Sequence, residues 1–107
     1  MSAWSSDETT FRAHAGSDGV WYLAGDLDVA AASLFESTVA ARLDAREDVA
    51  LDVADVTFLD SSGIRALLRL AGRVAPRSVV LVNPGAAVSA ALDLVNLDGT
   101  RIRIEAR

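Results

Sequence analysis

Residues 53–64 carry the clearest signal in the chain, and they read Val53-Ala54-Asp55-Val56-Thr57-Phe58-Leu59-Asp60-Ser61-Ser62-Gly63-Ile64. A buried strand is expected to run out into a short turn, which ends in Asp-Ser-Ser-Gly as an amphipathic helix begins. This order places a carboxylate, two hydroxyls and a glycine at a helix N-terminus, where free backbone N–H groups favour negative charge. A serine at such a position either caps the helix or accepts a phosphate that the helix end tolerates.

The flanking sequence predicts strands and helices in alternation. Hydrophobic spacing indicates strands at residues 11–15, 20–24, 49–53, 79–82 and 101–104, and helices at residues 29–43, 62–74 and 86–94. A hairpin turn is expected at residues 16–19, and Asp28 is a candidate cap for the first helix. The order β-β-α-β-α-β-α-β predicts an α/β domain with a mixed, largely parallel sheet of about five strands.

The length of 107 residues predicts one domain. Residues 1–10 are polar and are interpreted as a flexible lead-in, so the domain is assigned to residues 11–107. The first residues lack the basic start of a signal peptide, and no apolar run reaches ~18 residues. The sequence therefore predicts a cytoplasmic protein that does not insert into a membrane.

Composition excludes several classes of chemistry. The net charge is −5, which argues against a nucleic-acid binder. All ten basic residues are arginines, so lysine-dependent phosphate loops and Schiff bases are excluded. Cysteine is absent, and the single histidine, His14, has no second metal ligand at a recognisable spacing. No cofactor and no metal site are expected.

Two motifs, taken together with their positions, resemble a known family. Gly25-Asp26-Leu27-Asp28 follows a strand, and Asp60-Ser61-Ser62-Gly63-Ile64 opens a helix after an apolar strand. This arrangement resembles the STAS domain and, more narrowly, the bacterial anti-sigma factor antagonists. The resemblance extends over about residues 11–103, and it implies a single STAS domain with helices packed mainly on one side of the sheet.

The resemblance implies a partner-switching regulator. Such proteins bind an anti-sigma factor that is also a serine kinase, and the binding frees the sigma factor for transcription. The kinase carries the ATP and inactivates the antagonist by phosphorylating one serine, and a metal-dependent phosphatase of the PP2C type reverses the modification. The chain itself is expected to be no enzyme, because it lacks a nucleophile elbow and has only His14 as a histidine base.

The family's functional positions map onto the two motifs. The resemblance implies that Ser61 is the phosphate acceptor, that Asp28 and Asp60 are the acidic positions beside it, and that Gly63 is the turn glycine. Ser62 is interpreted as a structural hydroxyl directed at backbone donors. Together with Asp28, Asp60 and Gly63 it is expected to belong to the partner-binding surface. If Ser62 is the acceptor instead, the mechanism holds and the modified residue changes.

Other charged residues allow two interpretations each. Arg65, Arg69 and Arg73 recur every four residues, which forms a basic stripe along the second helix. The stripe is either an ordinary solvated face or a contact for acidic groups of the kinase, in which case Arg65 and Arg69 bind the partner. Asp26 is either a turn residue or, by the family match, an interface residue.

A second function is compatible with the same motifs. The chain could be a STAS subunit of a membrane lipid-transport or anion-transport system that never uses its serine as a switch. The fold and the helix start would be the same in both cases. Binding of a kinase-type ATPase partner would separate the two hypotheses.

Overall fold

The computed structural model describes residues 11–40 and 47–107. The lead-in expected at residues 1–10 and the last residues of the first predicted helix lie outside the described residues. The described residues form a five-stranded sheet and helices in the order β1 (Arg12–Ala15), β2 (Trp21–Leu27), α1 (Val29–Ala40), β3 (Val49–Leu59), α2 (Ser61–Val74), β4 (Val79–Val82), α3 (Ala86–Leu92) and β5 (Ile102–Glu105).

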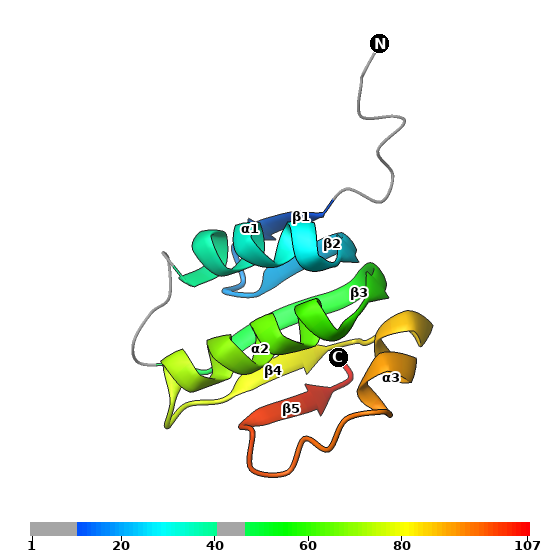
Figure 1. Cartoon of the computed structure of the whole chain (residues 1–107). Helices are drawn as coiled ribbons and strands as arrows, with labels where there is room; N and C mark the ends of the chain where they lie inside the picture. The colour runs from blue at the N-terminus through cyan, green and yellow to red at the C-terminus, as the bar shows by residue number, and fades with distance from the viewer. Residues whose placement is uncertain (1–10, 41–46) are drawn as a thin grey trace.

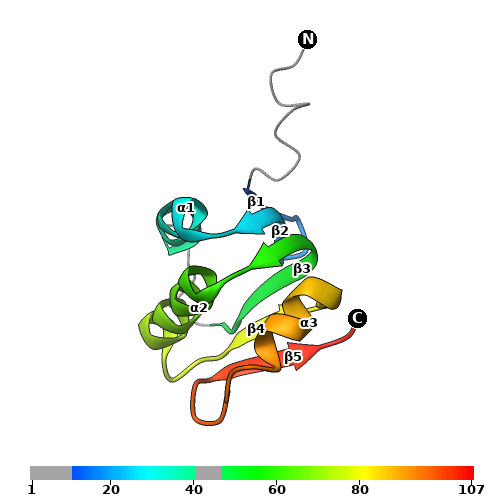
Figure 2. The same ribbon diagram turned by 45° about the vertical axis from the view of Figure 1, so that its right-hand side comes forward.

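The strands lie in the sheet in the same order as in the sequence (Figure 1). β1 and β2 form the antiparallel hairpin, and the pairs β2–β3, β3–β4 and β4–β5 are parallel. α1 and α2 lie side by side over one face of the sheet, and α3 lies at the end where the parallel strands finish (Figure 2). The predicted α/β class, the mixed sheet and the one-sided placement of the main helices are therefore confirmed.

β3 is longer than predicted, and it leaves no room for a turn. It continues to Leu59, whereas the sequence indicated an end near Val53. Apolar residues recur at every third position, at Val53, Val56 and Leu59, whereas a half-buried strand has them at every second position. Two register shifts against β2 each add a residue to β3. Such bulges reset the alternation of side chains, and all three apolar residues become buried.

β2 also continues past its predicted end, through the first motif to Leu27. Gly25 lies inside the strand with a φ of 90°, a backbone conformation that favours glycine, and the second register shift follows it directly. Asp26 is therefore a strand residue and not a turn residue. Its Oδ1 atom accepts a 2.7 Å hydrogen bond from the Thr57 hydroxyl of β3.

The core lies between the sheet and the two long helices. All four residues of β4 are buried, which confirms the prediction of a strand covered on both faces. β5 is one of the two edge strands, and it runs from Ile102 to Glu105. Ile102 is buried, whereas Ile104 is 50% exposed because an edge strand has a neighbour on one side only.

Gly63 allows the first turn of α2 to pack closely against the end of β2. A Cβ atom at this position would lie 2.3 Å from the Leu27 carbonyl oxygen and 2.5 Å from Cδ1 of Leu59. Both distances are far shorter than a van der Waals contact. The absence of a side chain at Gly63 therefore fixes how near the start of α2 comes to the β2–α1 junction.

This packing predicts that Gly63→Ala destabilises the protein by about 1–3 kcal/mol, the usual cost of overpacking. Gly72→Ala in the same helix is the matched control, since nothing lies within 4 Å of its added Cβ. Alanine in an exposed helix interior gains up to ~1 kcal/mol over glycine. Urea unfolding of both variants measures the difference, and equal effects of the two substitutions would contradict the packing argument.

Candidate functional site

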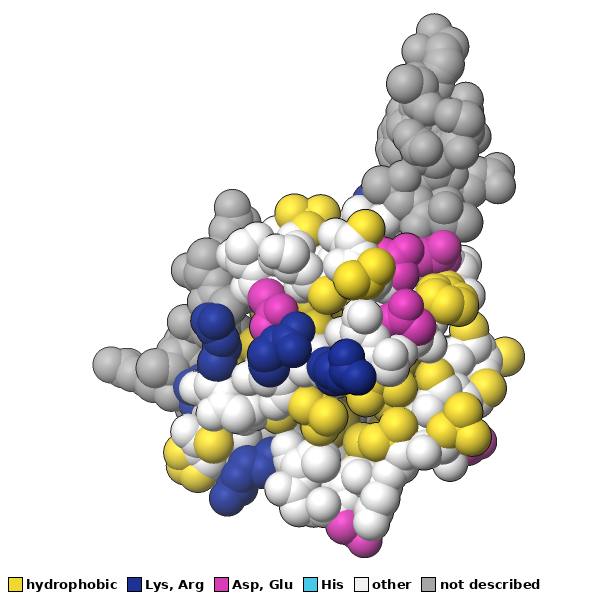
Figure 3. Space-filling model, viewed as in Figure 1, with side chains coloured by type: hydrophobic (Ala, Val, Ile, Leu, Met, Phe, Trp, Pro, Cys, Tyr) yellow, Lys and Arg dark blue, Asp and Glu magenta, His cyan; other side chains and the backbone are white. Residues whose placement is uncertain are grey.

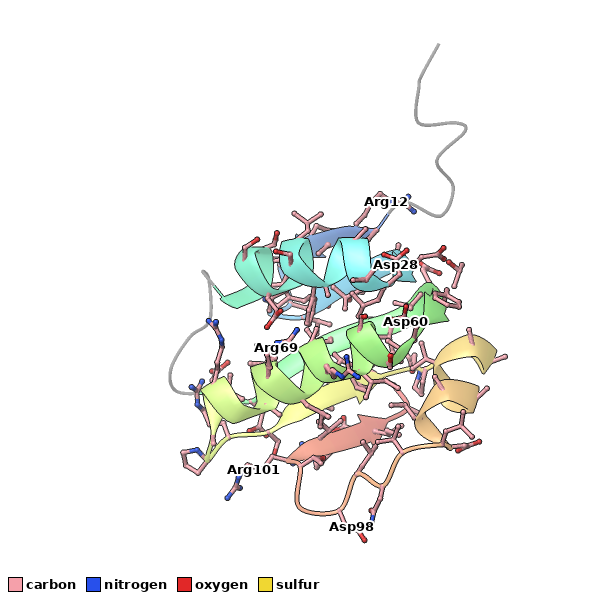
Figure 4. All side chains as sticks on the ribbon, viewed as in Figure 1. Arg12, Asp28, Asp60, Arg69, Asp98 and Arg101 are labelled. Carbon is pink, nitrogen blue, oxygen red and sulfur yellow. The ribbon has the colours of Figure 1, made fainter. Side chains whose placement is uncertain are left out.

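The two sequence motifs form neighbouring copies of the same local structure. Leu27 and Leu59 end β2 and β3, and they are partners in the parallel register. An aspartate follows each leucine, and a helix begins at the next residue, so Asp28 and Asp60 occupy equivalent places at one edge of the sheet. Figure 4 shows both carboxylates at this edge, where α1 and α2 begin.

Both aspartates cap helices with one carboxylate oxygen. Oδ1 of Asp60 accepts hydrogen bonds from the backbone N–H groups of Ser62, at 2.9 Å, and Gly63, at 3.1 Å. Oδ1 of Asp28 accepts one from the N–H group of Ala31, at 3.0 Å. The prediction that Asp28 caps the first helix is confirmed, and Asp60 rather than Ser61 is the cap of the second. These bonds satisfy N–H groups that a helix start otherwise leaves unpaired.

Ser61 is the first residue of α2 and its side chain is exposed. Its hydroxyl has no hydrogen-bond partner among the described residues, and the N–H groups of Ser62 and Gly63 are bonded to Asp60. The Ser62 side chain is half-buried and likewise has no bond to a described residue. The interpretation of Ser62 as a hydroxyl directed at backbone donors is therefore not borne out.

Gly63 takes part in the site through its packing. It is buried and has no side chain to present to a partner, and its close packing places the start of α2 against Leu27.

Two exposed apolar residues near the motifs, Val29 and Phe58, were not singled out from the sequence. Val29 is 74% exposed at the start of α1, and Phe58 is 47% exposed two residues before Asp60. Val29 directly follows Asp28, and Phe58 is the register partner of Asp26, so each is an exposed apolar side chain next to an acidic residue of the motifs.

The arginine stripe of α2 divides into residues with different surroundings. Arg69 forms a bidentate ion pair with Glu36 of α1, with N–O distances of 2.7 and 2.8 Å. The hydrogen bonds from Arg69 hold the pKa of Glu36 below its ordinary value, and the pKa of Arg69 is raised in turn. Glu36 was not predicted, since a pair 33 residues apart leaves no local signal. Arg65 forms no ion pair with a described residue.

A groove of about 240 Å³ lies between α1 and α2 and opens to solvent. Its walls combine small, hydroxyl and charged side chains, namely Val29, Ala32, Ser33, Glu36, Ser62, Arg65 and Arg69. Figure 3 shows basic side chains in a row over α2 and acidic side chains gathered where the helices begin. The structure therefore brings Ser62, Arg65 and Arg69 to one groove, and Ser62 directly follows Ser61 in the chain.

The single histidine, considered from the sequence as a base or a metal ligand, lies in β1. His14 is exposed and stacks on the ring of Tyr22, with centroids 5.4 Å apart. Within the described ranges, no three acidic or histidine side chains converge on a point where a metal ion could bind. No helix among the described residues has the length and apolar character needed to cross a membrane.

A comparison with known families shows the family to which the chain belongs. A family model described as "Mlab, STAS domain" matches residues 10–104. Because the match extends over nearly the whole chain, the protein belongs to the STAS family, as the two motifs predicted. A comparison with curated proteins finds no match.

The capping geometry predicts that Asp60→Ala destabilises the protein by about 0.5–2 kcal/mol, because two N–H groups lose their acceptor. Asp60→Asn is the matched control, since its side-chain oxygen can accept the same bonds. Urea unfolding measures both variants. A loss as large in Asp60→Asn as in Asp60→Ala would show that the carboxylate charge, and not the cap, provides the stability.

The Glu36–Arg69 pair predicts a pH-dependent contribution to stability. A carboxyl whose pKa is lowered by folding stabilises the protein fully above its ordinary pKa of 4.5, and loses this effect as the pH falls through the lowered value. Glu36→Gln should therefore lower the urea midpoint at about pH 7, and the difference should be smaller at about pH 3, below the ordinary pKa. The exposed Asp98→Asn serves as the control. A difference that is the same at both pH values would contradict the ion-pair account.

Proposed function

We propose that the protein is an anti-sigma factor antagonist that acts by partner switching. In its unphosphorylated form it binds an anti-sigma factor with serine kinase activity, and this binding releases the sigma factor. The kinase, which holds the ATP, phosphorylates Ser61 and thereby ends the interaction. A PP2C-type phosphatase restores the active form. All of these steps take place in the cytoplasm, and the chain itself performs no catalysis.

The state of Ser61 is the observation that carries the proposal. The hydroxyl is exposed at the first position of α2, and it is bonded to no described residue. Asp60 performs the capping role that a serine could otherwise fill. Ser61 is therefore accessible to a kinase, and a phosphate there would leave the caps of both helices intact.

The charges around Ser61 support an electrostatic switch. Phosphorylation adds about −1.5 to −2 charges beside Asp28 and Asp60. A partner surface that fits a neutral hydroxyl would then meet a large anion, and like charges several ångströms apart cost on the order of 1–3 kcal/mol per pair. Two such contacts weaken binding by ~100-fold. The switch therefore needs no change of fold.

The exposed apolar side chains support a protein partner. Val29 and Phe58 add apolar contact area around the acidic residues of the site. Interfaces combine a buried apolar centre with a polar rim, so this surface is suited to a protein. Asp26, Asp28, Asp60 and Arg65 form the polar part of the proposed interface, and Arg69 lies further along the same groove.

A STAS subunit of a membrane lipid-transport or anion-transport system is the second candidate. The family description names Mlab and the STAS domain but no activity, so the family match is compatible with this function as well. Asp28, Asp60 and Gly63 also have complete structural roles without any phosphorylation. In this case the surface around Ser61 would bind a partner permanently, and no kinase would recognise it.

Intact mass spectrometry tests the proposal. The protein is incubated with ATP, magnesium and each candidate anti-sigma kinase from the neighbouring genes, and wild type is compared with Ser61→Ala and Ser62→Ala. We expect the gain of one phosphate in wild type and in Ser62→Ala, and no gain in Ser61→Ala.

Two other outcomes have clear meanings. A phosphate gain that is lost only in Ser62→Ala would keep the mechanism and move the acceptor by one residue. No gain in any folded variant would favour the transport subunit, and co-purification with a transport ATPase would then support that function.

A further inference from the structure

Arg65 is the groove-lining arginine of the α2 stripe whose charge is still available. Arg69 is engaged by both carboxylate oxygens of Glu36, so its guanidinium is committed to holding α2 against α1. Arg65 lines the same groove, is exposed, and forms no ion pair with any residue in the described ranges. It is also the arginine of the stripe nearest to Ser61.

The helix geometry brings Arg65 and Ser61 together. Residues four apart lie on the same helix face, with their Cβ atoms about 5–6 Å apart. Side chains on a helix lean toward its N-terminus, so the long Arg65 side chain extends in the direction of Ser61. Both residues are exposed. The Ser61 hydroxyl and the Arg65 guanidinium have no bond to a described residue, so the two side chains can come into contact without breaking one.

We propose that Arg65 is the counter-ion of phosphorylated Ser61, an inference that rests on the proposed function. The kinase transfers the γ-phosphoryl group of ATP to Oγ of Ser61. The new O–P bond forms, the bond to ADP breaks and the hydroxyl proton is released. The guanidinium of Arg65 then forms a bidentate, charge-assisted pair with the phosphate oxygens.

This ion pair changes the groove as well as the serine. Glu36 neutralises Arg69, so Arg65 supplies the net positive charge of the groove in the unphosphorylated protein. That charge is complementary to a carboxylate of the kinase. Phosphorylation draws Arg65 toward Ser61 and removes this contact. The partner thus loses an attractive contact at the groove at the same time as it meets a new anion.

Phosphorus NMR of the full chain tests the ion pair without any kinase. Phosphoserine is incorporated at position 61 during translation, and the second pKa of the phosphate, ordinarily ~6, is measured by titration. A nearby guanidinium favours the dianion, so Arg65→Gln should raise this pKa by about 0.3 pH unit. Arg73→Gln removes the same charge two turns further along α2, and it should leave the pKa unchanged. An equal pKa in wild type and Arg65→Gln would overturn the proposal.

Kinase binding separates this inference from the proposed function. With the unphosphorylated chain, Arg65→Gln should weaken binding by about 3- to 10-fold relative to wild type and Arg73→Gln, as expected for one interfacial charge pair. Unchanged affinity in Arg65→Gln would overturn the proposed role of the groove. If no anti-sigma kinase binds the wild-type chain, the proposed function fails, and the phosphorus titration still decides whether Arg65 pairs with the phosphate.

Discussion

Gly63 lies so close to the Leu27 carbonyl that no side chain fits between them, and this close approach places the start of α2 against the end of β2. The arrangement of the site depends on it. The parallel register pairs Leu27 with Leu59, so the aspartates that follow them lie at the same edge of the sheet. Each aspartate then starts a helix through its cap. With any side chain at Gly63, α2 would have to move, and Ser61 would move with it.

Structural roles and the proposed phosphate acceptor are divided among adjacent residues at this edge. Asp28 and Asp60 use one oxygen each to cap helices, and Gly63 provides the close approach. Ser61 takes part in none of these contacts, although it lies between Asp60 and Gly63. A modification there can alter the charge of the surface while the elements beneath it keep their bonds. Such a division is what a surface switch requires of its scaffold.

Local sequence patterns predicted the strands and helices, and the pairing between strands decided the length of β3, which the patterns did not predict. The apolar run at residues 79–82 and the alternation of strands and helices identified the fold class. The length of β3 escaped prediction because its apolar residues recur at every third position, and only the bulges against β2 turn Val53, Val56 and Leu59 inward. The motifs pointed to Asp28 and Asp60, which the structure places at two helix starts, and the role of Ser61 stays a prediction. Neither the Glu36–Arg69 pair nor the exposed Phe58 has a signature within a single segment.

The affinity of the anti-sigma kinase for the two forms of Ser61 tests the central claim most directly. The dissociation constant is measured for the unphosphorylated chain and for the chain that carries phosphoserine at position 61. The electrostatic account predicts that the phosphate weakens binding by ~100-fold. Equal affinity of the two forms would contradict the claim that Ser61 is the switch.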